Sequence, residues 1–237
     1  MTGNKQILFA GDPHGNFAPL ITAVKRFKPK AVVMLGDYDL KKPLDYYLED
    51  IMDLTEVWWI PGNHDFEDAQ HYNNLFASRL AHRGLHLKIV EIAGLRIAGL
   101  GGIFLGRVWY PPNEPKWRSK QDFLTHNLSR YSRPELSLKY RSAIWHDEWA
   151  SLKQQRADIL VTHEAPRTHR HGFHAIDQLA QAMGVRKVFH GHLHEHYAAF
   201  IRRGIQVFGV GDGKVADLSG KDVNQEKITT RSGISGN

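Results

Sequence analysis

Cysteine is absent from this chain of 237 residues. Its absence excludes disulfide bonds, thiolate zinc sites and a cysteine nucleophile. Any bound metal ion must therefore be held by His, Asp, Glu, Asn or backbone oxygen. These ligands suit manganese, iron, zinc, cobalt or magnesium, and they argue against copper(I) and iron–sulfur clusters.

Long apolar runs are also missing. No stretch approaches the roughly 18 residues that a membrane-spanning helix needs. The first twelve residues, MTGNKQILFAGD, show neither the apolar region nor the cleavage site of a signal peptide. We therefore expect a soluble, cytoplasmic protein with no membrane partner.

Acidic residues are scarce in one segment, although the formal net charge of the whole chain is only +6. Residues 103–142 contain eight Lys and Arg against three Asp and Glu, with aromatic residues between them. Basic groups interleaved with rings are typical of single-stranded nucleic-acid sites, so nucleic acid is one candidate partner. The alternative, which we favour, is a lid whose aromatic residues pack on its own helices. The sequence leaves the oligomeric state open.

The first third of the chain alternates short buried strands with helical segments. This order predicts a mostly parallel sheet covered by helices. The predicted strands are 6–12, 31–37 and 56–65, and the predicted helices are 17–27, 41–54 and 67–81.

The remainder predicts one continuous domain, residues 1–214, with a loop and helix insertion at about 103–142. Two hairpins are expected, at residues 85–102 and 197–211. Strands are expected at 158–166 and 185–194, and helices at 142–157 and 175–184. Residues 215–237 are polar and without periodicity, which predicts a mobile tail.

Histidines crowd into residues 188–196, VFHGHLHEH, at the end of a predicted strand. Imidazoles at a spacing of two residues favour metal binding, which needs partners elsewhere in the chain. Four other predicted strands also end in polar turns, and such strand ends meet along one edge of a sheet. Taken singly, each turn is more typical of a helix cap or a structural turn. Taken together, they predict one metal site built from Asp12-Pro13-His14, Gly36-Asp37, Gly62-Asn63-His64-Asp65, His163 and Gly191-His192-Leu193-His194.

This series of motifs, from about residue 6 to residue 211, resembles the calcineurin-like metallophosphoesterase superfamily. The resemblance implies a four-layer αββα sandwich, in which two mixed β-sheets are flanked by helices. It also implies two divalent metal ions, for which we expect manganese first. Asp12, His14 and His194 would bind one ion and Asn63, His163 and His192 the other. Asp37 would bridge the two ions, and His64 would be the catalytic acid–base residue.

The chemistry of these residues agrees with that implication. Two cations about 3.5–4 Å apart can share a hydroxide and aim it at phosphorus. An imidazole such as His64 can protonate a departing alkoxide near neutral pH. His190 and His196 are expected to lie outside the ligand set.

One motif departs from the family pattern. The usual G-D-x-x-D is Gly36-Asp37-Tyr38-Asp39 here, so the carboxylate that normally orients the catalytic histidine is displaced by one residue. We expect Asp39, Asp65 or another carboxylate to orient His64 instead. Arg-Gly, typical of protein Ser/Thr phosphatases and diadenosine tetraphosphatases, does not follow this motif, which favours the phosphodiesterase-like branch.

Basic residues after His163 are the candidates for substrate binding, namely Arg167 and Arg170. The alternative is a solvated basic loop with no role in binding. Our hypothesis is hydrolysis of a phosphodiester of a nucleotide or nucleic acid. The alternatives are a phosphomonoesterase or pyrophosphohydrolase of a small metabolite, and a non-catalytic metal-binding scaffold subunit.

Overall fold

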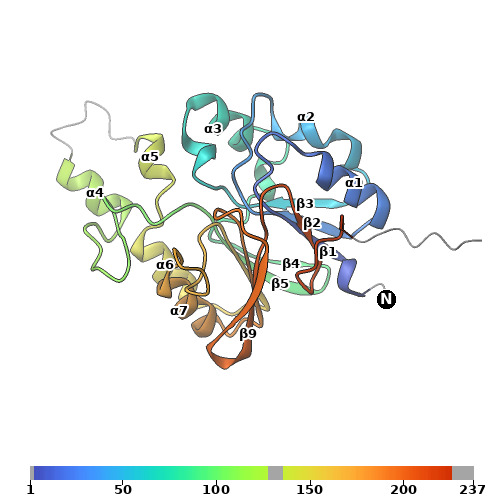
Figure 1. Ribbon diagram of the computed structural model, residues 1–237. Coiled ribbons are helices and arrows are strands. Elements are labelled where there is room, and N and C mark those ends of the chain that lie inside the picture. The colour runs from blue at the N-terminus through green and yellow to red at the C-terminus, as the bar shows by residue number, and fades with distance from the viewer. Residues whose placement is uncertain (1–2, 128–135, 226–237) are drawn as a thin grey trace, which may run out of the picture.

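The computed structural model describes residues 3–127 and 136–225 (Figure 1). Its strands form two sheets, packed face to face, with helices on both outer faces. The predicted four-layer αββα sandwich is therefore confirmed. Among the described residues, no helix combines the length and the hydropathy needed to cross a bilayer.

The first sheet contains the parallel strands predicted for the first third of the chain. Its order is β10-β1-β2-β3, with β10 antiparallel to β1. The strands are β1 (Ile7–Ala10), β2 (Ala31–Met34), β3 (Glu56–Trp59) and β10 (Val215–Ala216).

The second sheet has the order β4-β5-β6-β7-β9-β8. The four central strands are parallel, and an antiparallel hairpin partner closes each edge. Both predicted hairpins are present. The strands are β4 (Ile89–Ile92), β5 (Leu95–Leu100), β6 (Ile159–Thr162), β7 (Lys187–His190), β8 (Tyr197–Ile201) and β9 (Ile205–Gly209).

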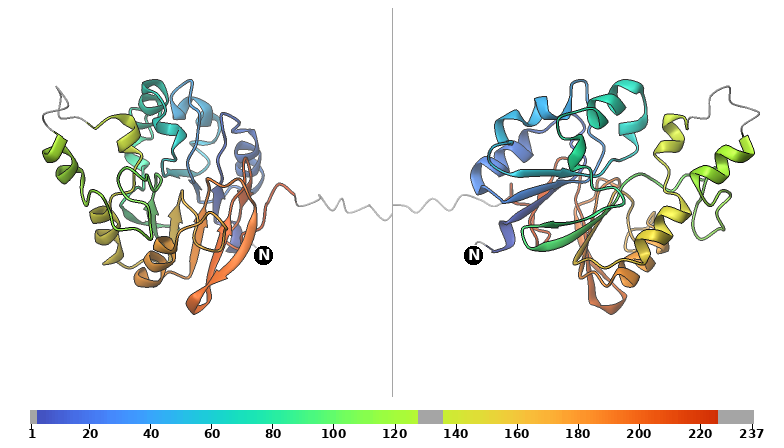
Figure 2. Two further views of the ribbon diagram at one scale, coloured as in Figure 1. Left: turned by 60° about the vertical axis from the view of Figure 1, so that its left-hand side comes forward. Right: turned by 180° about the vertical axis from the view of Figure 1, so that it is seen from behind.

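Helices cover the outer face of each sheet (Figures 1 and 2). On the first sheet lie α1 (Ala18–Phe27), α2 (Leu44–Leu48) and α3 (Ala69–Phe76), and on the second lie α6 (His146–Lys153) and α7 (His174–Met183). Residues of the insertion form α4 (Lys120–Asn127) and α5 (Leu138–Arg141). Short 3-10 helices are η1 (Gly3–Lys5), η2 (Glu49–Ile51), η3 (His64–Phe66), η4 (Ala81–Arg83) and η5 (Arg202–Gly204).

Side-chain alternation along the strands divides the core into layers. In β1, Ile7 and Phe9 face the second sheet, whereas Leu8 faces the helices of the first sheet. Phe9 stacks on Phe189 of β7 with ring centroids 3.7 Å apart, and both rings are fully buried. Burying a side chain of this size contributes about 1.5–3 kcal/mol. This contact holds the two sheets in register next to the strand ends that carry the polar turns.

The mobile tail was predicted to begin at residue 215, but residues 215–225 pack on the first sheet. Val215 and Ala216 pair with β1 as β10, and the side chain of Val223 is fully buried against the first sheet. The prediction is wrong for residues 215–225, because a two-residue strand and one apolar side chain leave no periodic signal in a polar segment. Residues 226–237 lie outside the described residues.

Four aromatic residues in the described part of the basic segment 103–142 face inward. Trp109 and Phe123 are buried in the core of the second sheet, and Trp117 and Tyr140 pack against it. Packed rings are not available for stacking on bases, so these contacts support the lid alternative over a nucleic-acid platform. Within the described part of the segment, Tyr110 is the large hydrophobic side chain that remains exposed.

Candidate metal centre

Five polar turns converge where β1, β2 and β3 of one sheet meet β6 and β7 of the other. Each turn follows its strand within one to five residues, so the strand ends fix the start of every turn. All seven predicted ligands are brought together there. They form two groups, each with one buried carboxylate.

The first group contains Asp12, His14 and His194. Nε2 of His14 and Nε2 of His194 are 3.2 Å apart, and His194 Nε2 lies 3.8 Å from Asp12 Oδ2. His14 is held from behind, because its Nδ1 is 2.9 Å from Asp39 Oδ2. The two imidazoles therefore aim their Nε2 atoms at one point beside the Asp12 carboxylate.

The second group contains Asp37, Asn63, His163 and His192. His163 Nε2 lies 3.2 Å from Asp37 Oδ2 and 3.3 Å from Asn63 Oδ1. Donor atoms of Asp37, His163 and His192 all lie within 4.8 Å of one another. Since His163 Nδ1 is 2.8 Å from the backbone oxygen of Leu35 and can donate to it, Nε2 is left as the free ligand atom.

Asp12 and Asp37 connect the groups through buried contacts. His163 Nδ1 lies 3.8 Å from Asp12 Oδ1, while Asp37 Oδ1 accepts the backbone N–H of His64. The side chains of Asp12 and His163 are fully buried, and that of Asp37 is 1% exposed.

Three motif glycines permit this close approach. A Cβ at Gly191 would overlap the Asp12 carboxylate, and one at Gly62 would overlap the Asp37 carboxylate. Gly36, at φ +113°, faces His163 Nδ1, which a Cβ would meet at 2.5 Å. Each glycine therefore makes room for a ligand side chain rather than only for a turn.

Backbone strain is concentrated at the same turns. Five non-glycine residues of the centre have positive φ. They are His14 (42°), Asp37 (54°), Asp39 (50°), His192 (69°) and His194 (55°). Left-handed conformations are costly for such residues and gather at functional sites. Here the left-handed backbone directs these side chains toward the candidate metal centre at the edge of the sheets.

Electrostatics indicate that the centre suits cations. Burial raises the pKa of Asp12 to about 7, and within the described residues its Oδ1 has no hydrogen-bond partner. Burial alone would lower the pKa of His163, but the Asp37 carboxylate raises it to about 10. A buried carboxylate oxygen without a hydrogen-bond donor needs another partner, and a cation can supply it. Two carboxylates, four imidazoles and one amide oxygen are a ligand set that divalent cations fit.

His64 stands at the rim and is oriented by a residue that the sequence analysis missed. Its Nδ1 lies 2.9 Å from Glu67 Oε1 and 3.8 Å from Asp39 Oδ1. Of the two expected carboxylates, Asp39 is within ion-pair distance of His64 but is closer to His14. The spacing His-x-x-Glu across η3 was the available signal for Glu67.

Asp65 has a different task from the one expected. It is fully buried, and its carboxylate accepts backbone N–H groups of Asp37, Tyr38 and Gly62 at 2.7–3.1 Å. These bonds occupy both oxygens, so the expectation that Asp65 orients His64 is wrong. It joins the turn after β2 to the turn after β3, which fixes Asp37 relative to Asn63.

Glu164 was also missed in the sequence. It is buried next to His163, accepts the backbone N–H of Phe104 at 2.9 Å, and lies 4.0 Å from His192 Nε2. Burial raises its pKa to about 7. It connects the start of the insertion to the ligand turn.

The two predicted substrate arginines line a surface cavity of their own. Arg167 and Arg170 line a cavity of about 530 Å³ formed with residues 109–115 and 171–175, which none of the seven ligand candidates lines. The Arg167 backbone N–H donates to Asp177, and its guanidinium lies 3.7 Å from the same carboxylate. His190 is buried with Nε2 2.8 Å from the Tyr197 hydroxyl, as expected for a structural histidine.

Comparison with known proteins identifies a family. The profile of the calcineurin-like phosphoesterase family matches residues 5–196. A protein of Haemophilus influenzae is 36% identical over 215 residues, covering 90% of this chain and 94% of its own.

Solved structures share the fold. A crystal structure from Thermus thermophilus has a TM-score of 0.57 at 17% identity, covering 91% of this chain and 95% of its own. A dimetal phosphatase from Danio rerio has a TM-score of 0.53 at 16% identity, covering 90% and 93%.

The chain belongs to the calcineurin-like phosphoesterase family. It is a metal-dependent hydrolase of phosphate esters.

Proposed function

We propose that the centre holds two divalent metal ions and hydrolyses a phosphodiester. Asp12, His14 and His194 would hold one ion, and Asn63, His163 and His192 the other, with Asp37 shared. The convergence of these seven donors on one edge of the two sheets supports the proposal. When bound, such a pair of cations supplies an activated water and neutralises charge on phosphoryl oxygens.

His64 is proposed as the acid that protonates the leaving oxygen. Its side chain is 37% exposed at the rim, whereas Asp37 and His163 are buried below it. Glu67, 2.9 Å from Nδ1, would keep the proton on that nitrogen and orient the ring. Nε2 would then face the substrate.

A diester is proposed over a monoester from the side chains that contact the ligand candidates and from the motif after β2. In the described part of the chain, no Lys or Arg side chain forms a hydrogen bond or ion pair with the seven ligand candidates. A phosphodiester carries one negative charge and a monoester close to two at neutral pH, so a diester needs less cationic support. Lys41-Lys42-Pro43, in place of Arg-Gly, supports the same branch.

The test is hydrolysis of an aryl phosphodiester against the matching monoester. The protein is first treated with a chelator and then given manganese. Faster diester turnover is the expected result. Faster monoester turnover would reject the diester proposal, and no turnover with metal bound would favour a scaffold subunit. Repeating the assay with zinc, iron, cobalt and magnesium identifies the preferred ion.

A further inference from the structure

Two of the ligand histidines are held by an oxygen atom behind the ring. His163 Nδ1 lies 2.8 Å from the backbone oxygen of Leu35. His14 Nδ1 lies 2.9 Å from Asp39 Oδ2. In both rings Nε2 faces other candidate ligands. Histidines that bind metal ions almost always donate their other N–H to such an oxygen, which fixes the ring and its tautomer. A partner of the same kind is therefore expected for His192.

Glu164 is the partner that the structure offers to His192. Its Oε2 lies 4.0 Å from His192 Nε2, and its side chain is only 5% exposed. Within residues 3–127 and 136–225, no other carboxylate comes within 4.0 Å of a nitrogen of that ring. The separation is an ion-pair distance, about 1 Å longer than an N–H···O hydrogen bond.

The Glu164 side chain is anchored so that one oxygen remains for His192. Its Oε1 accepts the backbone N–H of Phe104 at 2.9 Å, and the Thr162 hydroxyl donates to its backbone oxygen at 2.6 Å. Among the described residues, Oε2 forms no hydrogen bond. Because the backbone and one oxygen are both fixed, the carboxylate presents Oε2 at a defined place beside the His192 ring.

Glu164 stands outside the set of ligand atoms. The donor atoms of Asp37, His163 and His192 lie within 4.8 Å of one another. The carboxylate of Glu164 does not join that group, and His192 is the one ligand candidate within its ion-pair distance among the described residues. This is the position of a carboxylate behind a ligand ring, not that of a further ligand.

We propose that Glu164 is a positioning residue for His192. With an ion bound, Glu164 Oε2 accepts the Nε2–H of His192 and leaves Nδ1 as the ligand atom. A small rotation of the His192 side chain, which is 27% exposed, closes the gap to hydrogen-bond length. The His192 backbone is held separately, by its N–H to Asp12 Oδ2 at 2.6 Å, so Glu164 acts on the ring and not on the turn. The inference rests on the proposed function, because it takes His192 as a ligand of the inner ion.

Nitrogen NMR of His192 tests the proposal without a change at Glu164. Chelator-treated protein is titrated with zinc, which is diamagnetic, at mildly alkaline pH. The His192 signals are identified by their loss in His192→Gln. In the zinc-loaded protein we expect the hydrogen on Nε2 and zinc on Nδ1. The reverse arrangement, with the hydrogen on Nδ1 and zinc on Nε2, would overturn the proposal.

Glu164→Gln separates positioning from anchoring. The amide oxygen can still accept the Phe104 N–H, but an NH₂ group then faces His192 Nε2 and cannot accept its hydrogen. We expect zinc to bind the inner position about 10–100-fold more weakly by calorimetry, because the loss of such an outer partner typically has that effect. The NMR spectrum should show both tautomers of His192. Unchanged zinc affinity with a single Nε2–H tautomer would reduce Glu164 to a structural anchor and overturn the proposal.

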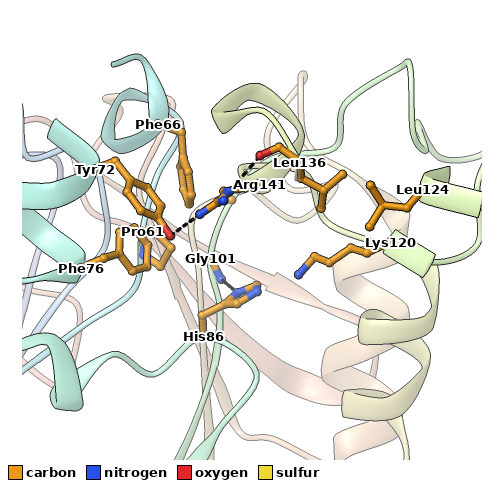
Figure 3. Close-up of a pocket in the computed structure, with 11 residues that line it drawn as sticks. Pro61, Phe66, Tyr72, Phe76, His86, Gly101, Lys120, Leu124, Leu136 and Arg141 are labelled. Carbon is orange, nitrogen blue, oxygen red and sulfur yellow. Dashed lines mark hydrogen bonds between the residues drawn. The ribbon is translucent and has the colours of Figure 1, made fainter. Parts of the chain in front are cut away.

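Glu148→Gln is the matched control, because Glu148 Oε2 also lies 4.0 Å from a histidine Nε2, that of His86. His86 accepts the backbone N–H of Gly101 on Nδ1 and lines a cavity of about 460 Å³ (Figure 3). None of the seven ligand candidates lines that cavity. Glu148→Gln should therefore bind zinc like the unmodified protein, and equal weakening in Glu148→Gln and Glu164→Gln would overturn the proposal.

Turnover plays no part in these measurements, so the role of Glu164 and the proposed hydrolysis fail separately. Zinc binding without hydrolysis of a diester would reject the proposed reaction, and the NMR and calorimetric results would still decide the role of Glu164. An absence of zinc binding by the unmodified protein would overturn the metal centre and, with it, the positioning of His192.

Discussion

The two halves of the metal centre differ in depth. His163 is fully buried, with one ring nitrogen bonded to a backbone oxygen and the other facing Asp37 and Asn63. In the other half, Asp12 is also fully buried, but His194 is 47% exposed, against 27% for His192, the more exposed histidine of the inner half. A buried, prearranged ligand loses less freedom on metal binding than an exposed one. The inner position is therefore expected to hold its ion more tightly than the rim position.

Since Asp37 is proposed to be shared by both halves, changing it should have the largest effect. Asp37→Asn keeps the size but removes the charge that both ions would share. We expect a loss of activity of about 10³-fold or more, because the change removes charge stabilisation in a buried site. Activity and metal content are measured together.

Near-normal turnover with two ions bound would contradict a bridging role for Asp37. Asp65→Asn is the matched control, since Asp65 is an equally buried carboxylate that bonds backbone N–H groups instead. Asp65→Asn should lower stability more than it changes metal content.

Removing one histidine from each half tests the comparison directly. His163→Ala should lose the inner ion at any manganese concentration. His194→Ala should lose only the rim ion, and excess manganese should restore part of the activity. Metal content after dialysis, measured across a manganese series, separates the two cases. Equal loss in both variants would show that depth does not set affinity.

His64 also lies at the rim, but we expect it to act as an acid and not to bind metal. His64→Gln should leave metal content unchanged and slow hydrolysis of an alkyl ester by about 10²-fold or more. A 4-nitrophenyl ester, whose leaving group needs no proton, should be slowed far less. Glu67→Gln should give a smaller loss of the same kind. Equal slowing of both esters would reject His64 as the acid.

Much of this site could be predicted from the sequence because each ligand follows a buried strand. Runs such as AVVM and ILVT fix where a parallel strand ends, and the carboxyl ends of such strands meet. Asp12, Asp37 and His163 were found in this way. Their positions could be located from the ends of the strands, because each ligand follows its strand within a few residues.

Contacts between loops were beyond sequence reasoning. Asp65 was predicted from its position next to His64, yet its side chain turns inward to the turn after β2. Glu164 joins an insertion 60 residues away, and β10 adds two residues to a sheet that begins at residue 7. These choices depend on three-dimensional packing between segments, and neither periodicity nor spacing records it.

Alkaline pH should weaken the metal-free protein, and this is the smallest effect we expect. Asp12 and Glu164 have pKa values raised to about 7, and that of His163 is raised to about 10. A group whose folded pKa is raised stabilises the fold below its unfolded pKa and loses that contribution as pH rises through the folded value. The contributions of Asp12 and Glu164 should therefore be lost between about pH 4 and pH 7, and that of His163 between about pH 6.5 and pH 10. Above pH 7 the free energy of unfolding should fall through His163. Asp37, whose pKa is held well below its usual range by His163 despite burial, stays charged throughout that window.

Metal binding should reverse this trend, because cations take the place of the protons on Asp12 and His163. Tm of chelator-treated protein should fall from pH 6 to pH 9, by about 2–4 °C for each kcal/mol in a chain of this size. With manganese present, Tm should hold steady or rise over the same interval. Asp12→Asn should flatten the metal-free curve, because it removes the Asp12 titration below pH 7 and one of the charges that raise the pKa of His163. Asp158→Asn, at an exposed ion pair with Arg186, should not. A metal-free Tm that does not change with pH would contradict the raised pKa values of Asp12 and His163. The expectation that the inner position binds its ion more tightly would then rest on burial alone.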